Sequence, residues 1–282
     1  MKIRKNFLPR YLPDIGASLF LLIAIPATFW FEIYVVLPDM HAVGSFPYYF
    51  TIVAAVFITF NITTNLLAIM LVDTSIKGEV LVPPENPTLK DLWTLCPICE
   101  TLTPPRSWHC NTCKTCILKR DHHCTFAGYC VGHKNHRYFL MLITYLFIGT
   151  VYASIYNSIY IWWLHGKEFI EAFAFLKIVF PFLMLLMNSS QTNVYLCLYV
   201  LNLIGFAFGL TLLIYHLNII LNGSVSFERR DKAKYDLGLR KNIEMVLGKR
   251  WYIAWISPVI VSELPHDGIH WESILEDSAK NR

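Results

Sequence analysis

Residues 96–130 read CPICETLTPPRSWHCNTCKTCILKRDHHCTFAGYC, and this stretch holds seven of the 8 cysteines of the chain. The remaining cysteine, Cys197, lies in an apolar segment. Such dense clustering with Cys-x2-Cys spacing predicts either disulfides or bound metal, and the cellular compartment decides between them. The location of this stretch is therefore the first question.

The sequence around this stretch has the composition of a membrane protein. Of its 282 residues, 55% are hydrophobic and 16% are charged, and the mean hydropathy is +0.44. A membrane-spanning helix needs about 20 mostly apolar residues. Four segments meet that requirement, namely 15–37, 46–72, 138–164 and 194–221.

A fifth apolar segment, residues 173–187, is shorter than a membrane span. It also contains Lys177 and Pro181, which interrupt the apolar run. We therefore expect an interfacial or re-entrant piece inside a lumenal segment, 165–193, and only four membrane spans.

The distribution of lysine and arginine predicts the orientation in the membrane. Of these 24 residues, four precede the first span, eight lie in the loop 73–137 and ten follow residue 221. The positive-inside tendency places the N-terminus 1–14, this loop and the tail 222–282 in the cytosol. Because cytosolic thiols stay reduced, metal is favoured over disulfides for the cysteine cluster.

The number of candidate ligands exceeds what two metal sites need. Structural zinc takes four thiolate or imidazole ligands, so two sites take eight. Seven cysteines together with His109, His122 and His123 offer ten, which leaves at least two spare. Counting alone does not identify the spare cysteine. The run Asp121-His122-His123-Cys124 favours Cys124, because an acid and an imidazole beside a thiol suit a nucleophilic site.

These observations predict an all-α integral membrane protein with four transmembrane helices and a cytosolic, zinc-stabilised cysteine-rich domain, 73–137. The start of that domain is rich in proline, which breaks helices, so we expect short β-hairpins around the metals. A segment this small rarely builds a sufficient apolar core, and bound metal would supply the missing stability.

The stretch 96–130 resembles, spacing for spacing, the cysteine-rich domain of the DHHC-type protein S-acyltransferases, or palmitoyltransferases. The four-span layout resembles that family as well. The resemblance implies one structural zinc ion on Cys96, Cys99, His109 and Cys116, and a second on Cys110, Cys113, His123 and Cys130. It leaves Cys124 as the nucleophile, His122 as its base and Asp121 as the residue that orients the imidazole.

The activity that the resemblance implies is transfer of a palmitoyl group from acyl-CoA, through a thioester on Cys124, to cysteines of substrate proteins at the cytosolic membrane face. Palmitoyl-CoA is then the co-substrate, and the bilayer and cysteine-containing proteins are the partners. The family also implies the endoplasmic reticulum or the Golgi. A nucleic-acid partner is not expected, because the net charge of +4 is small and scattered.

Three short motifs outside the cysteine-rich stretch resemble the family to different degrees. Asp73-Thr74-Ser75 keeps only the acid of the family's Asp-Pro-Gly, and Val225-Ser226-Phe227-Glu228 keeps the glutamate and one hydroxyl of its Thr-Thr-x-Glu. Tyr235-Asp236-x-Gly238 with Asn242 matches the tail motif better. For Ser226, Glu228 and Asn242, hydrogen bonding at a helix end is the favoured interpretation over catalysis.

Basic and histidine side chains flank the Asp121–Cys124 run. Lys119, Arg120, Lys134 and Arg137 are candidates to bind the phosphates of CoA, and attraction to anionic lipid headgroups explains the same pattern. His133 and His136 fit packing or surface histidines better than spare metal ligands.

A competing hypothesis is a catalytically silent membrane scaffold, or a zinc module that recruits partners. Such modules also use eight cysteine and histidine ligands. This hypothesis gives Asp121, His122 and Cys124 no role, and it predicts that Cys124→Ala changes nothing.

Overall fold

A computed structural model describes residues 2–169, 174–228 and 235–271. Four helical segments are long and apolar enough to cross a membrane: Leu12–Met40, Phe46–Leu71, His136–Leu164 and Gln191–Leu221. The shortest has 26 residues, which at 1.5 Å per residue gives about 39 Å, more than the roughly 30 Å of a bilayer core. The chain is a multi-pass membrane protein.

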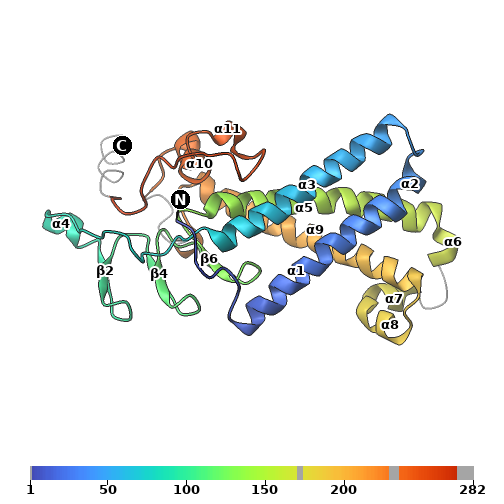
Figure 1. Cartoon of the computed structure of the whole chain (residues 1–282), viewed down its shortest axis with the longest axis horizontal. Coiled ribbons are helices and arrows are strands. Elements are labelled where there is room, and N and C mark those ends of the chain that lie inside the picture. Colours follow the sequence, from blue (N-terminus) through green and yellow to red (C-terminus); the bar gives the residue numbers. More distant parts are fainter. Residues whose placement is uncertain (1, 170–173, 229–234, 272–282) are drawn as a thin grey trace. The chain divides into compact units, whose positions relative to one another are not determined.

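These spans are built from five α-helices and two π-helical turns (Figure 1). The first span comprises α1 (Leu12–Phe31), the π-helix η1 (Glu32–Val36) and α2 (Leu37–Met40). The second is α3 (Phe46–Leu71), the third is α5 (His136–Ser158) with the π-helix η2 (Ile159–Leu164), and the fourth is α9 (Gln191–Leu221).

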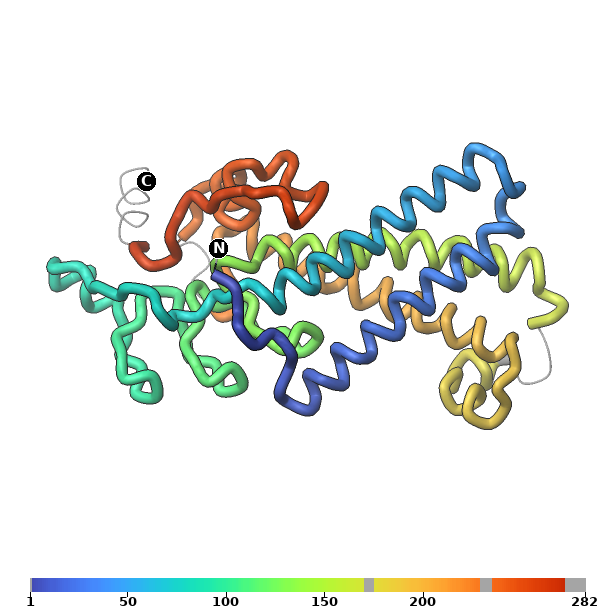
Figure 2. The backbone as a smooth tube through the Cα atoms, in the orientation of Figure 1, coloured from blue at the N-terminus to red at the C-terminus, as the bar shows by residue number. Residues whose placement is uncertain are grey.

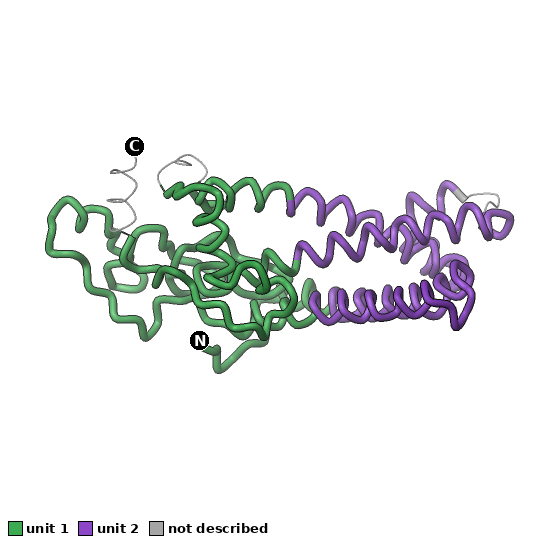
Figure 3. The backbone as a smooth tube through the Cα atoms, turned by 90° about the horizontal axis from the view of Figure 1, so that it is seen from above, with its two compact units in different colours: residues 1–19, 63–142, 214–282 green, residues 20–62, 143–213 purple. Residues whose placement is uncertain are grey.

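The chain divides into two compact units, which Figure 3 colours separately. Unit 1 contains residues 1–19, 63–142 and 214–282, and unit 2 contains residues 20–62 and 143–213. Unit 1 therefore holds one end of every span together with the cysteine-rich stretch and the tail.

Unit 2 contains the greater part of the four spans. A cluster of buried apolar side chains packs inside it; its members are Phe31, Val36, Tyr160, Ile161, Phe169, Leu196 and Tyr199. The segment expected to be interfacial or re-entrant contains the short helices α7 (Ala174–Val179) and α8 (Pro181–Met187), and its first residue, 173, lies outside the described residues. These helices have 6 and 7 residues, so neither crosses a bilayer alone. Another short helix, α6 (Gly166–Phe169), precedes them.

Three two-stranded antiparallel hairpins form the cysteine-rich stretch of unit 1. They pair β1 (Thr94–Cys96) with β2 (Thr101–Thr103), β3 (Trp108–Cys110) with β4 (Thr115–Ile117), and β5 (His122–Cys124) with β6 (Tyr129–Val131). A two-stranded hairpin with 3-residue strands is marginal in water by itself, so something besides strand pairing must hold these three.

The three hairpins repeat one another at an interval of 14 residues. In each, a cysteine ends the first strand, and Cys96, Cys110 and Cys124 pair with Thr101, Thr115 and Tyr129. The turn that follows holds one residue in the left-handed region, Glu100 (φ 51), Lys114 (φ 53) or Gly128 (φ 66). Non-glycine residues rarely adopt that conformation, which indicates that ligand placement dictates these turns.

The remainder of unit 1 is made of the chain termini and short elements. Near the N-terminus, Lys2 and Arg4 pair with the carboxylate of Asp73 at the end of α3, at 3.6 and 3.9 Å. Asp73 also accepts a hydrogen bond from the amide of Ser75 at 2.9 Å, so the acid retained from the Asp-Pro-Gly motif caps this turn. The other elements are α4 (Pro87–Lys90), the 3-10 helix η3 (Ser226–Glu228), α10 (Leu239–Leu247) and α11 (Trp251–Ala254).

The tail after α11 runs back past the hairpins, as the backbone trace in Figure 2 shows within unit 1. Gly268 packs so closely on His133 that an added Cβ would lie 2.6 Å from its ring. Trp271 is completely buried and donates its indole N–H to the carbonyl of Gly268 at 3.0 Å. The last described residue is thus an anchor of the tail.

Candidate active site and metal centres

The first cysteine cluster combines residues of the first two hairpins. Cys96 and Cys99 lie on the first hairpin, and His109 and Cys116 lie opposite each other on the second. The three sulfur atoms lie 3.7, 3.3 and 3.9 Å from Nδ1 of His109. The metal-ligating atoms of two neighbouring hairpins therefore converge on one point.

The second cluster repeats this arrangement one hairpin later. Cys110 and Cys113 come from the second hairpin, and His123 and Cys130 come from the third. The sulfur atoms lie 3.7, 3.4 and 3.7 Å from Nδ1 of His123. These two clusters have the membership expected from the sequence.

Both clusters fit tetrahedral zinc. Zn–S and Zn–N bonds of about 2.3 and 2.0 Å put neighbouring ligand atoms roughly 3.5 to 3.8 Å apart in a tetrahedron. The nitrogen–sulfur distances above bracket the lower figure, and the two sulfur atoms of Cys113 and Cys130 are 3.7 Å apart. All 8 cysteines are free thiols. Two Cys3His centres, consistent with zinc, therefore join the hairpins in pairs.

Asp14 supports the second centre, and the sequence analysis missed it. Its carboxylate accepts a hydrogen bond from Nε2 of His123 at 3.0 Å, across 109 residues of sequence. A carboxylate on the outer nitrogen fixes the tautomer and the orientation of a metal-bound histidine. No local pattern around Asp14, at the start of α1, indicates this partner.

Cys124 occupies the third hairpin beside His122 and Asp121. The Nδ1 atom of His122 donates to Oδ2 of Asp121 at 2.6 Å, and the thiol of Cys124 is close enough to act electrostatically on the same imidazole. Cys124 is 6% exposed, and Asp121 is 2% exposed. The structure thus brings together the three residues that the sequence singled out, in the order acid, imidazole, thiol.

The electrostatics of this group favour a charged imidazole. Burial lowers the pKa of His122, but the interactions with Asp121 and Cys124 outweigh burial and raise that pKa to about 9. Burial raises the pKa of Asp121, yet the hydrogen bond from His122 and the nearby imidazoles bring it well below its usual range. An anionic carboxylate therefore holds an imidazolium, and an imidazolium beside a thiol promotes the thiolate.

Ser226 holds the other side of the Asp121 carboxylate. The backbone N–H of Ser226 donates to Oδ1 at 2.8 Å, and its hydroxyl donates to Oδ2 at 2.9 Å. The altered Val-Ser-Phe-Glu motif therefore keeps the hydroxyl that reaches the acid, 105 residues away in sequence. This contact is structural support of the site and not merely a helix-end hydrogen bond.

Glu228 of the same motif neutralises a buried arginine. Its two carboxylate oxygens accept from Nε and a terminal nitrogen of Arg106 at 2.7 and 2.6 Å. The guanidinium also packs on two aromatic rings that stand edge to face, 4.2 Å from the ring centre of Tyr235 and 4.4 Å from that of Trp271. A bidentate ion pair combined with aromatic contacts is a favourable arrangement for a buried arginine.

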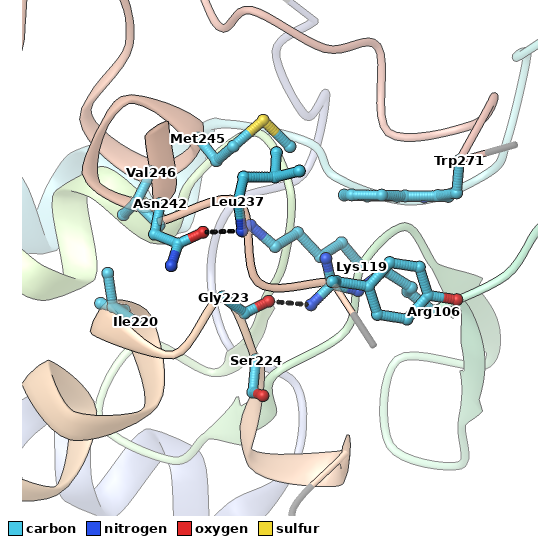
Figure 4. Close-up of a pocket in the computed structure, with 11 residues that line it drawn as sticks. Arg106, Lys119, Ile220, Gly223, Ser224, Leu237, Asn242, Met245, Val246 and Trp271 are labelled. Atoms are coloured by element: carbon cyan, nitrogen blue, oxygen red, sulfur yellow. Dashed lines mark hydrogen bonds between the residues drawn. The ribbon is translucent and has the colours of Figure 1, made fainter. Parts of the chain in front are cut away.

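A recess adjoins this arginine, and Figure 4 draws the residues that line it. Arg106 donates to the carbonyl of Gly223 at 2.8 Å. On the far wall, Asn242 accepts from the amide of Leu237 at 3.1 Å and donates to the carbonyl of Leu221 at 2.8 Å. These contacts agree with the interpretation of Asn242 as a residue that fastens the end of α9 to the tail.

The four basic candidates for phosphate binding differ in what they contact. Lys134 pairs with Glu79 at 2.6 Å, Arg120 donates to the carbonyl of His109 at 2.9 Å, and Arg137 donates to the carbonyl of Pro258 at 3.0 Å. Lys119 lines the recess, is 3% exposed and makes no ion pair within the described part of the chain.

Burial lowers the pKa of Lys119 to about 7. Its amine lies 5.9 Å from the ring centre of Trp271, at the limit of a cation–π contact. Lys119 therefore carries a partial charge at neutral pH, and within the described residues Glu228 and Asp121 act on it without forming an ion pair.

The two histidines outside the metal sets are both buried. His133 packs against Gly268 and donates Nε2–H to the carbonyl of His266 at 2.8 Å, as a packing histidine would. His136 begins α5 and approaches Asp121 together with His216, near the end of α9. The sequence analysis did not single out His216.

Comparison with known proteins agrees with this site. The family model of the DHHC palmitoyltransferases matches residues 90–233. A zebrafish (Danio rerio) protein named probable palmitoyltransferase ZDHHC24 is 35% identical over 223 residues, which cover 78% of this chain and 74% of that protein. The human (Homo sapiens) protein of the same name is 30% identical over 231 residues, covering 78% and 77%. A protein of Arabidopsis thaliana named probable protein S-acyltransferase 12 is 32% identical over 172 residues, covering 58% and 53%.

The fold and the site define a membrane protein with two Cys3His centres and an adjacent acid–imidazole–thiol group. The chain belongs to the DHHC palmitoyltransferase family. Its activity is that of an acyl-CoA-dependent protein-cysteine S-acyltransferase.

Proposed function

We propose that Cys124 carries the acyl group between palmitoyl-CoA and a substrate protein. The thiolate attacks the thioester carbonyl of palmitoyl-CoA, a new S–C bond forms, and CoA leaves as a thiol after taking up a proton. A cysteine thiolate of the substrate protein then attacks the acylated Cys124 and leaves with the chain. Both steps exchange one thioester for another, so neither requires a further energy source.

The imidazole of His122 is proposed to take the proton of Cys124 and return it to the departing CoA sulfur. Asp121 is proposed to keep Nδ1 of His122 protonated, which leaves Nε2 for the thiol. The observations that support these roles are the 2.6 Å bond between Asp121 and His122 and the electrostatic effect of Cys124 on His122. The two bonds from Ser226 hold the acid in place.

The ligands of the two metals are proposed to be Cys96, Cys99, His109 and Cys116 for the first and Cys110, Cys113, His123 and Cys130 for the second. Bound zinc would supply folding stability, because four protein ligands leave no coordination position for substrate. His123 lies between His122 and Cys124 in sequence. The second metal therefore fixes the strand that presents the thiol.

The phosphates of CoA are proposed to bind at the recess that Arg106 and Lys119 line. Of the four basic residues considered from the sequence, Lys119 is the one that lines this recess. Lys119→Gln is expected to raise the KM for palmitoyl-CoA more than it lowers kcat. An unchanged KM would exclude this position.

We further propose that the hairpins and both termini face the cytosol and that the protein resides in the endoplasmic reticulum or the Golgi. The excess of lysine and arginine in residues 1–14, 73–137 and 222–282 supports the orientation. Cytosolic thiols remain reduced, as metal binding by the six cysteines of the two centres requires.

The decisive experiment is self-acylation of the purified protein with labelled palmitoyl-CoA, comparing the wild type with Cys124→Ala. We expect the wild type to take up label that neutral hydroxylamine releases, and a folded Cys124→Ala with two bound metals to take up none. Cys197→Ala is the matched control, since that thiol lies outside the hairpins and should not affect labelling. Equal labelling of Cys124→Ala would refute the role of Cys124 and favour a scaffold function.

A further inference from the structure

A third group of metal-ligating side chains lies directly behind the acid of the site. Asp121, His136 and His216 each offer one ligand atom, and the three atoms lie within 4.8 Å of one another. They are 2%, 1% and 3% exposed. They come from three separate places: the residue before β5, the first turn of α5 and the last turns of α9.

The two imidazoles lack the hydrogen bonds that buried rings normally make. Within the described part of the chain, neither ring nitrogen of His136 has a hydrogen-bond partner, nor does Nδ1 of His216. Leaving a buried polar atom unsatisfied costs about 1 to 3 kcal/mol. Such atoms in a folded protein call for an explanation, and an ion is one of the usual ones.

The kinds of donor indicate which ion would fit. Two imidazoles and one carboxylate form a ligand set used by zinc and by other divalent first-row metals, whereas calcium and magnesium prefer oxygen alone. Nδ1 of His216 lies 3.7 Å from Oδ2 of Asp121. That separation is near the roughly 3.5 Å expected between ligand atoms of one tetrahedral ion.

Two neighbouring groups oppose metal binding and set its strength. Oδ2 of Asp121 already accepts hydrogen bonds from His122 at 2.6 Å and from the hydroxyl of Ser226 at 2.9 Å. Lys119 and the imidazolium of His122 both act electrostatically on His136, although burial lowers the pKa of the lysine amine to about 7. The site should therefore be weaker than the two Cys3His centres, which use three thiolates each.

We propose that Asp121, His136 and His216 form a third, reversible site for zinc or a similar divalent metal, and that its occupation draws Asp121 away from His122 and inhibits acyl transfer. The binding part stands independently of the reaction. The inhibitory part rests on the proposed role of Asp121. The ring of His216 lies 5.5 Å from that of His122, so the metal would sit behind the imidazole and not on the thiol.

Metal stoichiometry tests the site without reference to activity. The probe is Co2+, added to full-length protein in detergent that retains its two tightly bound metals, with the visible absorption of bound Co2+ as the signal. We expect one further equivalent to bind the wild type and none to bind His216→Leu or His136→Leu. His133→Gln, which alters a buried histidine outside the group, should still bind it.

Several outcomes would overturn the site. One is a wild type that takes up no third equivalent, and another is undiminished uptake by both leucine variants. A variant is included only if it retains two metals and unfolds cooperatively. The two variants change different helices, so damage to one does not prevent the test with the other.

Self-acylation tests the inhibitory part. Added Zn2+ should slow wild-type labelling by about tenfold or more, by analogy with the loss of an orienting carboxylate. The labelling rate of His216→Leu should be nearly the same with and without added Zn2+. Inhibition that persists in His216→Leu would place the metal on Cys124 and overturn this part. If the wild type does not label even without added Zn2+, the proposed role of Cys124 fails, while the Co2+ experiment still decides whether the third site exists.

Discussion

The second and third hairpins have the same backbone conformation, but different residues surround the cysteine that ends the first strand of each. Cys110 and Cys124 both end the first strand of an antiparallel pair and precede a turn with a left-handed residue. Three residues further on, the second hairpin has Cys113 and the third has Ala127. The remaining two ligand positions, filled by His123 and Cys130 for the second hairpin, correspond to Arg137 and Thr144 for the third.

This difference explains how the third hairpin presents a free thiol. Cys124 occupies the position that a metal ligand has in the second hairpin, but none of the other three positions of that ligand set holds a cysteine or histidine. The positions shortly before the cysteine gain an acid and an imidazole instead, since Ser107 and Trp108 of the second hairpin correspond to Asp121 and His122 of the third. One hairpin design therefore supplies ligands of a Cys3His cluster in one copy and an acid, an imidazole and a thiol in the next.

Serine substitution of the two cysteines should separate their roles most strongly. Cys110→Ser removes a ligand, so we expect loss of about one metal ion, loss of cooperative unfolding and loss of labelling. Cys124→Ser should keep two metals and the wild-type stability but lose labelling completely. Metal analysis, thermal unfolding and self-acylation check both. Loss of metal from Cys124→Ser would mean that the third hairpin is a ligand hairpin after all.

Asp121→Asn should reduce the rate by about three orders of magnitude while the metals and the fold remain, because an amide can hold His122 in the wrong tautomer. Ser226→Ala, which removes one of two bonds from the same residue, should cost only about tenfold. Single-turnover acylation at saturating palmitoyl-CoA measures both. Equal rates for Asp121→Asn and the wild type would contradict the orienting role of the acid.

Asp14→Ala should weaken the second metal centre by about 10- to 100-fold, as loss of a carboxylate behind a metal-bound histidine commonly does. The first centre should be unaffected, since Asp14 contacts His123 and not His109. The rate at which a chromogenic chelator removes each metal measures the effect, and we expect one metal to be released fast and the other slowly. Asp14→Asn is the conservative control, and equal release of both metals from Asp14→Ala would contradict the assignment.

Ala127→Cys should restore one missing ligand and convert the third hairpin partly back to the second. Cys-x2-Cys spacing then lets Cys124 bind a thiophilic metal. We expect Cd2+ to inhibit acylation of this variant at a concentration about tenfold lower than it inhibits the wild type, and a chelator to reverse the effect. Ala127→Ser controls for the added volume, and equal sensitivity of the cysteine and serine variants would argue against the equivalence of the hairpins.

Lys119 lies between these two hairpins in sequence, and its replacement should have the smallest of these effects, a change in stability. Its folded pKa of about 7 lies below the ordinary lysine value of 10.5, so between these values the unfolded chain binds more protons and stability rises with pH. Lys119→Met should therefore be more stable than the wild type by about 2–4 °C in Tm at pH 6, with the difference vanishing as pH approaches 10. Thermal unfolding across this range tests the sign. A difference that does not depend on pH would show that the amine is not buried as a base.

The sequence predicted the features that depend on local spacing. Four apolar runs of sufficient length predicted the spanning helices, and the number of clustered cysteines and histidines predicted two metal sites with ligands to spare. The run Asp121-His122-His123-Cys124 made Cys124 the favoured spare thiol. The resemblance to the DHHC family then supplied the ligands of each metal.

Contacts across long stretches of sequence could not be predicted. Asp14 supports His123 across 109 residues, Ser226 holds Asp121 across 105, and Glu228 pairs with Arg106 across 122. Each of these side chains is ordinary in its own surroundings and gains its role from the fold. His216 is another such residue, because a single histidine in an apolar helix gives no local sign of the acid it approaches.

The burial of Trp271 makes the end of the tail matter for the site. This ring covers Arg106, whose partner Glu228 lies two residues after the serine that holds Asp121. A premature stop codon just before position 271 would leave every hairpin residue in place and yet uncover a paired arginine. Such a truncation would resemble an active-site mutation in its effect, and a tag is better attached after residue 271 than at an internal site of the tail.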